Sequence, residues 1–549
     1  MPARNNTPMT LTCDYLVIGA GAAGCVIARR MAEAGFSVIL AEAGSADSDW
    51  RIHVPLLSML TMGNEARNWN FDTEPVPAFG GRSVRLLAGK VMGGSSSING
   101  LIYTRGHPAE FDRWRDMGCT GWGFEDVLPY YRISETSTRG ESRWHGQGGP
   151  WPIRHAPSSL PVYKAFLGAA DQLGIPVEDD LSAGIDEGIG FYDVNVSAQG
   201  RRISSARAYL NNGPDNLSIR PGLMAMRVIL DGTQATGAEC ADTAGQRVNV
   251  TANRETILCA GAINSPKLLM LSGIGDAEHI KGIGIEPRLD RPSVGRNLQN
   301  HACYTMLYAC SKPVSLLRYL QPVRAAAALF DYVIKGRGPL AETPFAVGGS
   351  FRTDPASIVP EMHVTFFSAL VQGHEPSPWP FRMLGLNSPL PERHGFGVTL
   401  SQGVPYSRGE VLLSSADPMA APKIYPRYFE DPRDMAALMA GVRKMQAVMK
   451  HPAIASLVQS ELVPGDNLPD EKIEESIRQY GGTFYHQSGT CAMGVTDEAV
   501  VDPRLRVRGI SGLRVADASV MPLILNATPH ASVIMIGEKA AAMIIEDLR

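Results

Sequence analysis

An apolar run followed by three closely spaced glycines, near the N-terminus, constrains the fold of this chain most strongly. Residues 14–24 read DYLVIGAGAAG, and residues 25–34 have the pattern of a helix. A buried strand that turns through G-x-G-x-x-G into a helix is typical of a βαβ unit that binds a dinucleotide. In such a unit Gly19 permits the sharp turn, Gly21 lets the backbone approach a pyrophosphate, and Gly24 lets helix and strand pack closely.

The residues around this turn favour a bound ligand over the alternative, an ordinary glycine-rich turn. Ala22 and Ala23 lie in the turn that leads into the helix, whose free N–H groups and positive dipole end attract phosphate. A second strand, 37–41, leads into Glu42 and Ala43. An acidic residue at this distance accepts hydrogen bonds from a ribose hydroxyl and disfavours a 2′-phosphate. We therefore expect these residues to contact the dinucleotide.

The length of 549 residues exceeds what one hydrophobic core supports, so we expect at least two domains. The net charge of −4 is small and gives no indication of binding to nucleic acid or to an anionic membrane. No apolar run is long enough to span a membrane, and the first residues lack the apolar core of a signal peptide. These observations predict a cytoplasmic protein without an integral membrane segment.

The eight cysteines are scattered, without a C-x-x-C pair or the spacing of a metal site. Cys13, Cys25 and Cys259 stand among apolar residues and are expected to fill the core. We therefore expect no bound metal, and the cysteine pattern agrees with a reducing compartment.

A second stretch of small residues, 89–100, reads GKVMGGSSSING. Its glycines and serines can bring many backbone N–H groups close to a flat or anionic ligand, although a flexible loop has the same composition. The residues expected at the ligand are Met92, Gly93, Gly94, Ser95, Asn99 and Gly100.

Several stretches along the chain together resemble one family. Residues 82–106, which include GKVMGGSSSINGLIYTRG, are similar to the first signature of the glucose–methanol–choline (GMC) flavoprotein oxidoreductases, and residues 261–275 to the second. The similar members are alcohol and choline dehydrogenases and aryl-alcohol and hydroxymethylfurfural oxidases. Further matches in family order extend the resemblance over nearly the whole chain, at 68–77, 144–146, 205–210, 294–298 and 501–522.

The resemblance implies that the dinucleotide is FAD. The first turn would hold its ADP half, and the Gly/Ser stretch would lie beside the isoalloxazine ring. Asp517 is expected at the cofactor, although an aspartate at that position can instead cap a turn or a helix. Some members attach FAD through a histidine where this chain has Ile98, so non-covalent FAD is expected. The family register also assigns to the cofactor Ala260, Gly261, Asp517, Ala518, His530 and Ala531.

Oxidation of an alcohol requires a base that removes the hydroxyl proton while hydride leaves the carbinol carbon, and histidine suits that task. The resemblance places the catalytic histidine at His486 and a second catalytic residue at His530. The second residue is histidine in aryl-alcohol and glucose oxidases and asparagine in choline-type members. We predict that His486 is the base and that His530 orients the hydroxyl. One departure from the family pattern is Asn300, where an aspartate is usual.

The expected fold is α/β, or α+β overall, with a Rossmann-type FAD-binding domain and a substrate-binding domain built on an antiparallel sheet with helices. We predict strands at 398–401 and 409–413, an amphipathic helix at 431–451 and a final helix at 531–548. The FAD-binding domain would comprise 10–155, 199–303 and 466–549, the last part carrying the catalytic histidines. The substrate-binding domain would comprise 156–198 and 304–465.

The substrate is predicted to be a neutral primary alcohol that is oxidised to its aldehyde. The stretch 340–349 resembles a choline-dehydrogenase segment, but Ala346 stands where that segment has the glutamate for the quaternary ammonium. Phe345, Phe484 and Tyr485 indicate an aromatic or apolar pocket, although such residues also serve plain packing. We favour an aromatic or allylic alcohol, and aliphatic alcohols and polyols stay open.

Other activities stay open within the resemblance. Hydroxynitrile lyases share the fold and use flavin without net redox chemistry, and a choline-type dehydrogenase is a further alternative. A light-driven fatty-acid decarboxylase would need an arginine for the carboxylate, and the stretch before Cys491 has none. The electron acceptor, which could be oxygen, a quinone or another compound, and the oligomeric state are not determined by the sequence.

Overall fold

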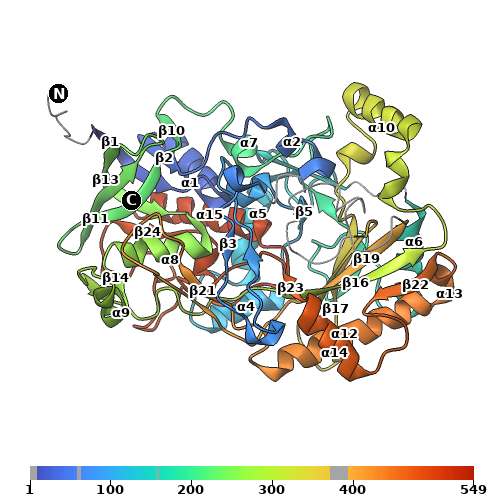
Figure 1. Ribbon diagram of the computed structural model, residues 1–549. Helices are drawn as coiled ribbons and strands as arrows, with labels where there is room; N and C mark the ends of the chain where they lie inside the picture. The colour runs from blue at the N-terminus through green and yellow to red at the C-terminus, as the bar shows by residue number, and fades with distance from the viewer. Residues whose placement is uncertain (1–8, 59–63, 156–157, 159, 371–392, 549) are drawn as a thin grey trace, which may run out of the picture.

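Two seven-stranded sheets organise the molecule. The structure is a computed structural model that describes residues 9–58, 64–155, 158, 160–370 and 393–548. Figure 1 shows the first sheet on the left and the second sheet on the right, with helices around both. The predicted combination of a Rossmann-type sheet and an antiparallel sheet is confirmed.

The first sheet contains the βαβ unit predicted from the glycines. Strand β1 (Met9–Ile18) leads into α1 (Ala22–Glu33), and β2 (Val38–Glu42) returns parallel to β1. The parallel strands follow the order β10–β2–β1–β13–β24, and a hairpin of β11 and β12 pairs antiparallel with the first half of β13. The remaining strands are β10 (Leu217–Pro221), β11 (Met224–Asp231), β12 (Gln234–Ala241), β13 (Arg247–Leu258) and β24 (Leu513–Val515).

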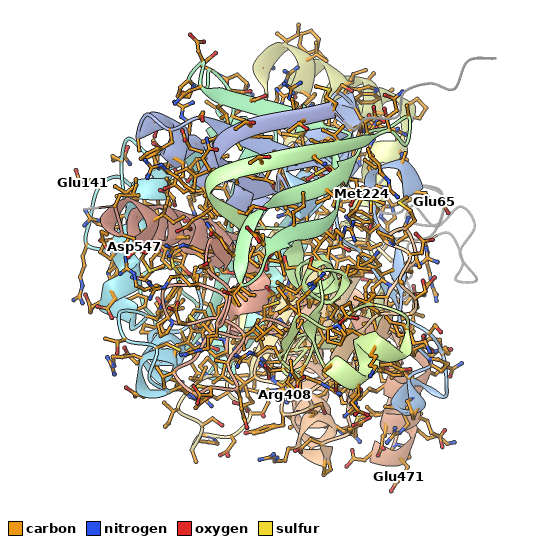
Figure 2. All side chains as sticks on the ribbon, turned by 90° about the vertical axis from the view of Figure 1, so that its left-hand side faces the viewer. Glu65, Glu141, Met224, Arg408, Glu471 and Asp547 are labelled. Atoms are coloured by element: carbon orange, nitrogen blue, oxygen red, sulfur yellow. The ribbon has the colours of Figure 1, made fainter. Side chains whose placement is uncertain are left out.

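Burial on both faces explains the apolar runs of this sheet. All five residues of β2 and the last four of β1 are buried, as expected for parallel strands covered by helices. Helix α1 packs against the last helix, α15 (His530–Glu546), whose apolar side chains belong to the same core. Figure 2 views the molecule from the side of this sheet, with Met224 of β11 and Asp547 beyond α15 labelled.

The second sheet is antiparallel throughout, in the order β22–β16–β19–β18–β17–β8, with β23 added beside β16. Helices α6 (Pro161–Gln172) and α12 (Pro432–Lys450) share its apolar core. Its strands are β8 (Gly188–Phe191), β16 (Ala302–Cys310), β17 (Val347–Phe351), β18 (Met362–Phe367), β19 (Gly395–Gln402), β22 (Val458–Val463) and β23 (Gly482–Thr483).

The elements predicted in the second half of the chain are confirmed. The strands expected at 398–401 and 409–413 are β19 and β20 (Glu410–Leu412), and the helices expected at 431–451 and 531–548 are α12 and α15. The domain boundaries stay predictions. Helix α14 (Asp470–Tyr480) and strand β23 follow the boundary at 465, yet they join the second sheet and its core.

Smaller elements complete the fold. All eight cysteines are buried and free, which agrees with their expected role as core residues. No helix in the described ranges is both long and apolar enough to cross a bilayer. The other helices include α2 (Trp50–His53), α4 (Pro108–Asp116), α5 (Phe124–Ser134), α7 (Ser205–Tyr209), α8 (Gly261–Leu271), α9 (Ala277–Gly282), α10 (Pro322–Lys335) and α13 (Pro452–Ala455); the other strands include β3 (Phe71–Asp72), β4 (Arg85–Leu86), β5 (Ile102–Tyr103), β6 (Glu135–Ser137), β7 (Trp151–His155), β9 (Asp193–Val194), β14 (Ile274–Gly275), β15 (Leu289–Asp290) and β21 (Lys423–Tyr425).

Candidate functional site

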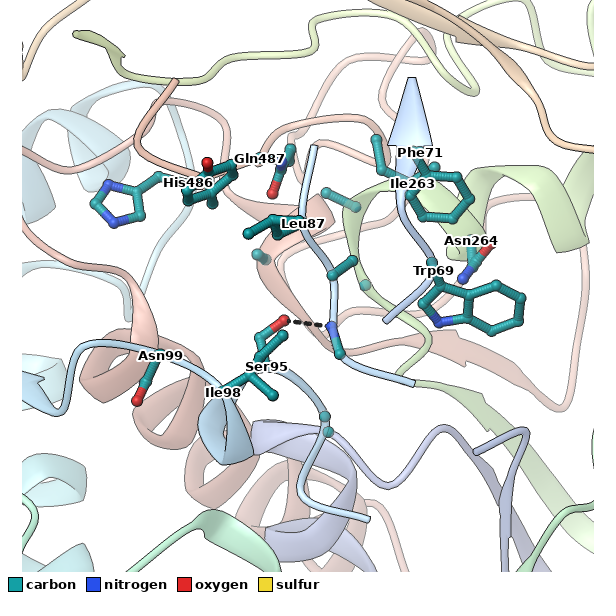
Figure 3. Close-up of a pocket in the computed structure, with 18 of the residues that line it drawn as sticks. Trp69, Phe71, Leu87, Ser95, Ile98, Asn99, Ile263, Asn264, His486 and Gln487 are labelled. Atoms are coloured by element: carbon teal, nitrogen blue, oxygen red, sulfur yellow. Dashed lines mark hydrogen bonds between the residues drawn. The ribbon is translucent and has the colours of Figure 1, made fainter. Parts of the chain in front are cut away.

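A cavity of 790 Å³ lies where the carboxyl ends of the first sheet's parallel strands meet the second sheet. The second sheet closes it with Thr305 of β16, Phe367 of β18 and Thr399 of β19. In Figure 3, His486 and Gln487 lie on one side of this cavity, across from the Gly/Ser stretch. The predicted site residues that line it are Gly19, Gly21, Ala22, Ala23, Glu42, Ala43, Gly94, Ser95, Asn99, Gly100, Ala260, Gly261, Phe345, Phe484, Tyr485, His486, Asp517, Ala518 and His530.

The glycine turn has the geometry that the sequence predicts. Gly19 has φ of +101°, and a Cβ there would lie 2.5 Å from the carbonyl oxygen of Cys259. A Cβ on Gly24 would overlap the carbonyl oxygen of Gly19, so Gly24 serves close packing and does not itself line the cavity. Gly21 caps α1 without a side-chain acceptor, which leaves the first N–H groups of the helix available for an anion.

Glu42 ties the end of β2 to the glycine turn. Its Oε2 accepts from the Ala20 N–H at 2.9 Å and its Oε1 from the Gly44 N–H at 2.7 Å. Burial raises the pKa of Glu42 to about 7, and the two backbone donors oppose that rise. A contact with a ribose stays a prediction.

The Gly/Ser stretch lies against the glycine turn and is held by a buried cation. Gly93, with φ of +88°, donates its N–H to Ala20 O at 2.8 Å, so Gly93 and the buried Met92 lie behind the cavity wall. The guanidinium of Arg202 donates to the carbonyl oxygens of Ser96 and Asn99 and to Oδ1 of Asn99. Burial lowers the pKa of Arg202 to about 9. This network shapes the wall that Ser95 and Asn99 present to the cavity.

Asp517 caps a helical turn and also lines the cavity. Its Oδ1 accepts from the Ser519 N–H at 2.8 Å, which caps the short 3-10 helix Ala518–Val520. Its Oδ2 accepts from the Gly261 N–H at 2.8 Å and from Ser265 Oγ at 2.6 Å. The capping role that the sequence left as an alternative is therefore present, and contact with the cofactor stays a prediction. Ala531 belongs to the first turn of α15 and lies outside the cavity lining.

The two candidate catalytic histidines have different partners. Nδ1 of His486 lies 2.8 Å from Nδ1 of His301, and Nε2 of His301 lies 3.1 Å from the carbonyl oxygen of Gly403. Burial lowers the pKa of His301 to about 3. Burial, followed by the charges of the neighbouring histidines, lowers the pKa of His486 well below its ordinary value. Both rings are therefore neutral at pH 7.

These contacts determine which nitrogen of His486 carries the proton. A carbonyl oxygen only accepts, so Nε2 of His301 holds a hydrogen and donates to Gly403. Nδ1 of the neutral His301 then has only a lone pair, and it accepts from the Nδ1–H of His486. Nε2 of His486 keeps its lone pair, and no group in the described ranges hydrogen-bonds to it. His486 thus offers a proton acceptor at the cavity wall.

Asn300 holds the backbone of His486 from behind. Its Oδ1 accepts from the His486 N–H at 2.8 Å, and its Nδ2 donates to the hydroxyls of Tyr428 and Thr483, both at 2.7 Å. The amide is buried. The departure from the family's aspartate therefore lies in direct contact with the candidate base, although not in the cavity lining.

His530 uses both ring nitrogens for contacts within the protein. Nδ1 lies 3.2 Å from Nδ2 of Asn99, and Nε2 lies 3.1 Å from Oγ of Ser205. Because Oδ1 of Asn99 accepts from Arg202, Nδ2 is the donor to His530, and Nε2 of His530 then carries the hydrogen. Burial lowers the pKa of His530 to about 3. The predicted role in orienting a hydroxyl stays a prediction, and neither nitrogen is free for it here.

The side of the cavity next to His486 is aromatic, and no acidic side chain of the described residues lines it. Phe345 packs edge-to-face on Phe367, with 5.9 Å between ring centroids, and Phe484 lies beside His486. Among the described residues that line the cavity, the acidic side chains are Glu42 and Asp517 alone. Both lie at the glycine turn and the Gly261 turn, where they accept backbone N–H groups.

Sequence reasoning assigned no site role to His301 or Arg202, nor to Thr305, Phe367 and Thr399 of the second sheet. His301 stands next to Asn300 in a stretch adjoining a family match, and its pairing with His486 joins positions that are 185 residues apart. Arg202 lies just before the matched stretch 205–210. The only indication in the sequence was that each of these two polar residues stands close to a stretch that matches the family. The hydrogen-bond partners of His301 and Arg202 could not be predicted from local spacing.

A Rossmann-type sheet and a glycine turn at a helix start are typical of a protein that binds a dinucleotide, and the neutral histidine across the cavity adds a proton acceptor. The chain belongs to the GMC oxidoreductases: the family's N-terminal part matches residues 13–303 and its C-terminal part matches residues 405–537. It is therefore an oxidoreductase that acts on CH–OH donors.

The relatives cover nearly the whole length of the chain. It is 36% identical to an oxygen-dependent choline dehydrogenase of Rhizobium etli over 97% of this chain and 96% of that protein. The structure of pyridoxine 4-oxidase from Mesorbium loti has a TM-score of 0.86 at 30% identity and covers 97% of this chain and 99% of its own. The structure of formate oxidase of Aspergillus oryzae RIB40, in an R554K variant, has a TM-score of 0.90 at 28% identity. That match covers 98% of this chain and 99% of the formate oxidase chain.

FAD is the cofactor that the family implies, and the residues present fit it. The helix start at Gly21 offers backbone donors to a pyrophosphate. A Cβ on Gly94 would lie 2.9 Å from Cα of Gly21, so two bare backbone stretches meet at the cavity wall. Such walls admit a flat dinucleotide close to the main chain.

Proposed function

We propose that the protein oxidises a neutral primary alcohol to the aldehyde, with Nε2 of His486 as the general base. The observation that carries this proposal is the chain from Gly403 O through His301 to His486, which leaves one unprotonated nitrogen at the cavity wall. A neutral imidazole at that position can accept the hydroxyl proton of a bound alcohol. His301 is a positioning residue, because it acts on the substrate only through His486.

The charge of the cavity supports a neutral substrate. Aromatic faces attract a quaternary ammonium, but a permanent cation bound away from water is stabilised further by an anionic partner. The acidic lining residues, Glu42 and Asp517, are both engaged by backbone donors at the dinucleotide end. Ala346 is buried and supplies no charge. We therefore favour an aromatic or allylic alcohol over choline, despite the choline dehydrogenase relatives.

The residues divide the work of the reaction between them. FAD, when bound, supplies the acceptor for the hydride that leaves the carbinol carbon. His486 takes the hydroxyl proton at Nε2, and His301 keeps Nδ1–H of His486 in place during that transfer. The aromatic residues Phe345, Phe484 and Tyr485 would hold the substrate and exclude water from the second-sheet side. His530, fixed by Asn99 and Ser205, would support the Gly/Ser stretch.

An anaerobic absorbance experiment tests the proposal. The purified holoenzyme is mixed with benzyl alcohol, an aliphatic primary alcohol, a polyol or choline, and bleaching of the flavin bands is followed. We expect the fastest bleaching with benzyl alcohol and none with choline. Fast bleaching with choline would overturn the neutral-substrate proposal, and a flavin that stays oxidised with every alcohol would favour the lyase alternative. Air is then admitted, and the speed at which the flavin bands recover shows whether oxygen, or instead a quinone or another compound, is the electron acceptor. The cytoplasmic location stays a proposal as well.

A further inference from the structure

Helix α10 (Pro322–Lys335) exposes an apolar face that takes no part in the cavity or its chemistry. Figure 1 shows α10 projecting from the body near the second sheet. The only buried residue of this 14-residue helix is Ala328. Its large apolar side chains are exposed instead, at Val323 (83%), Leu329 (56%), Phe330 (59%), Val333 (67%) and Ile334 (65%).

The exposed side chains form one continuous stripe. At about 100° per residue, Val323, Phe330 and Ile334 project within a narrow arc, and Leu329 and Val333 extend that arc on one side. Arg324 and Lys335 lie on its other border, near opposite ends of the helix, and Asp331 lies on the same border between them. A solvent-facing apolar stripe with a basic border is the pattern of a helix that lies in a membrane interface.

The base of α10 is fixed to the body of the protein. Gly336 ends the helix with φ of +60°, and a Cβ there would lie 2.6 Å from the backbone of Gln199. Ala328 and the half-buried Tyr332 face inward beside it. Close backbone packing therefore holds the stripe toward the solvent. A segment without such packing would not keep its apolar side chains in one fixed direction.

The charge around the helix is opposite to that of the whole chain. Residues 312–337 contain five basic residues and one acidic residue, whereas the complete chain has a net charge of −4. The acidic residue, Asp331, already pairs with Lys335 at 2.6 Å. Lys312, Arg324 and Arg337 are exposed and have no ion-pair partner in the described ranges. The small net charge of the whole chain gave no indication of binding to an anionic membrane, because it averages over this local excess of positive charge.

We propose that α10 docks the protein onto an anionic phospholipid surface. The helix is about 21 Å long, too short to span a bilayer, so it would lie in the interface with its stripe among the acyl chains. The basic residues at its border and ends would contact the lipid headgroups. The centre of the stripe carries no hydrogen-bonding side chain, which suits acyl chains better than a polar protein surface.

Sedimentation with lipid vesicles tests this docking. The holoenzyme is mixed with vesicles of phosphatidylcholine alone or with added phosphatidylglycerol. We expect binding to increase with the phosphatidylglycerol content and to weaken at high salt. Phe330→Ser/Ile334→Ser should reduce the partition coefficient at least about tenfold, and Arg324→Ala about fivefold. Turnover of a water-soluble alcohol should not change in these variants.

Ile358→Ser/Met419→Ser provides the matched control, because these side chains are 78% and 64% exposed and belong to other segments of the chain than α10. This control should bind vesicles as the unaltered protein does. The proposal is overturned if the unaltered protein does not bind anionic vesicles, or if both double variants lose binding equally. It is also overturned if sedimentation velocity shows a dimer that Phe330→Ser/Ile334→Ser dissociates, since the stripe would then join two copies of this chain.

Discussion

Two walls of the cavity each present a buried histidine, but the two rings have different partners. On the wall that includes β23, His486 donates one nitrogen to His301 and keeps Nε2 without a partner in the described ranges. On the wall at the start of α15, His530 lies between Asn99 and Ser205, which occupy both nitrogens. The positions of His486 and His530 in the family's motifs are enough to identify both histidines from the sequence. Only the hydrogen bonds separate a group that can accept a proton from one that supports a loop.

The largest expected effect is that of His486→Ala, which removes the proposed base. We expect kcat to fall about 10²–10⁴-fold, the usual contribution of a positioned base, while FAD stays bound. Anaerobic stopped-flow reduction with benzyl alcohol measures the change. The matched control is His53→Gln, which alters another buried histidine, at the end of α2 and outside the cavity lining. Normal turnover in His486→Ala would contradict the assignment of the base.

His301→Ala should have the next largest effect, because it removes the acceptor that fixes the tautomer of His486. We expect kcat to fall about tenfold, the equivalent of one lost hydrogen bond, with KM little changed. His301→Asn should restore most of the rate, since its carbonyl oxygen can still accept from Nδ1–H. A structural role alone would instead lower the melting temperature and the FAD content of both variants together.

The fold was predictable from sequence because its main signals are local. At Gly19 and Gly24 a side chain would collide with backbone a few residues away or on the adjoining strand, so the spacing alone identifies the turn. The pairing of His486 with His301 depends on β23 joining β16, which no local pattern encodes. Asn300 could be noted as unusual, but its contact with the His486 backbone required the folded chain.

His530→Asn should have a smaller effect than either change on the opposite wall. The ring contacts Asn99 and Ser205, so its loss should loosen the Gly/Ser stretch and weaken FAD retention. We expect kcat to change less than about tenfold and the KM for the alcohol to stay the same. FAD content after dialysis and steady-state kinetics measure the two quantities. Unchanged FAD content with a raised KM would instead support the hydroxyl-orienting role predicted from sequence.

Asn300→Asp should have the smallest effect, and it tests His486 from its backbone side. An aspartate can still accept from the His486 N–H, and the hydroxyls of Tyr428 and Thr483 can rotate to donate to it. Its negative charge favours the imidazolium form, so the pKa of His486 should rise from its lowered value. Because only the neutral ring accepts a proton, the acidic limb of the kcat/KM profile should move to higher pH.

Asn300→Ser separates this charge effect from a loss of geometry. Serine keeps an acceptor near the His486 N–H without adding a charge, so the acidic limb should stay where it is in the unaltered protein. The plateau rate above that limb should change little in Asn300→Asp, because the base is then neutral in both proteins. A limb that moves to lower pH in Asn300→Asp would mean that the titrating group is not His486. A plateau that falls as far as in His301→Ala would mean that Asn300 fixes the ring as strongly as His301 does, and the contrast between the two walls would then rest on two positioning residues.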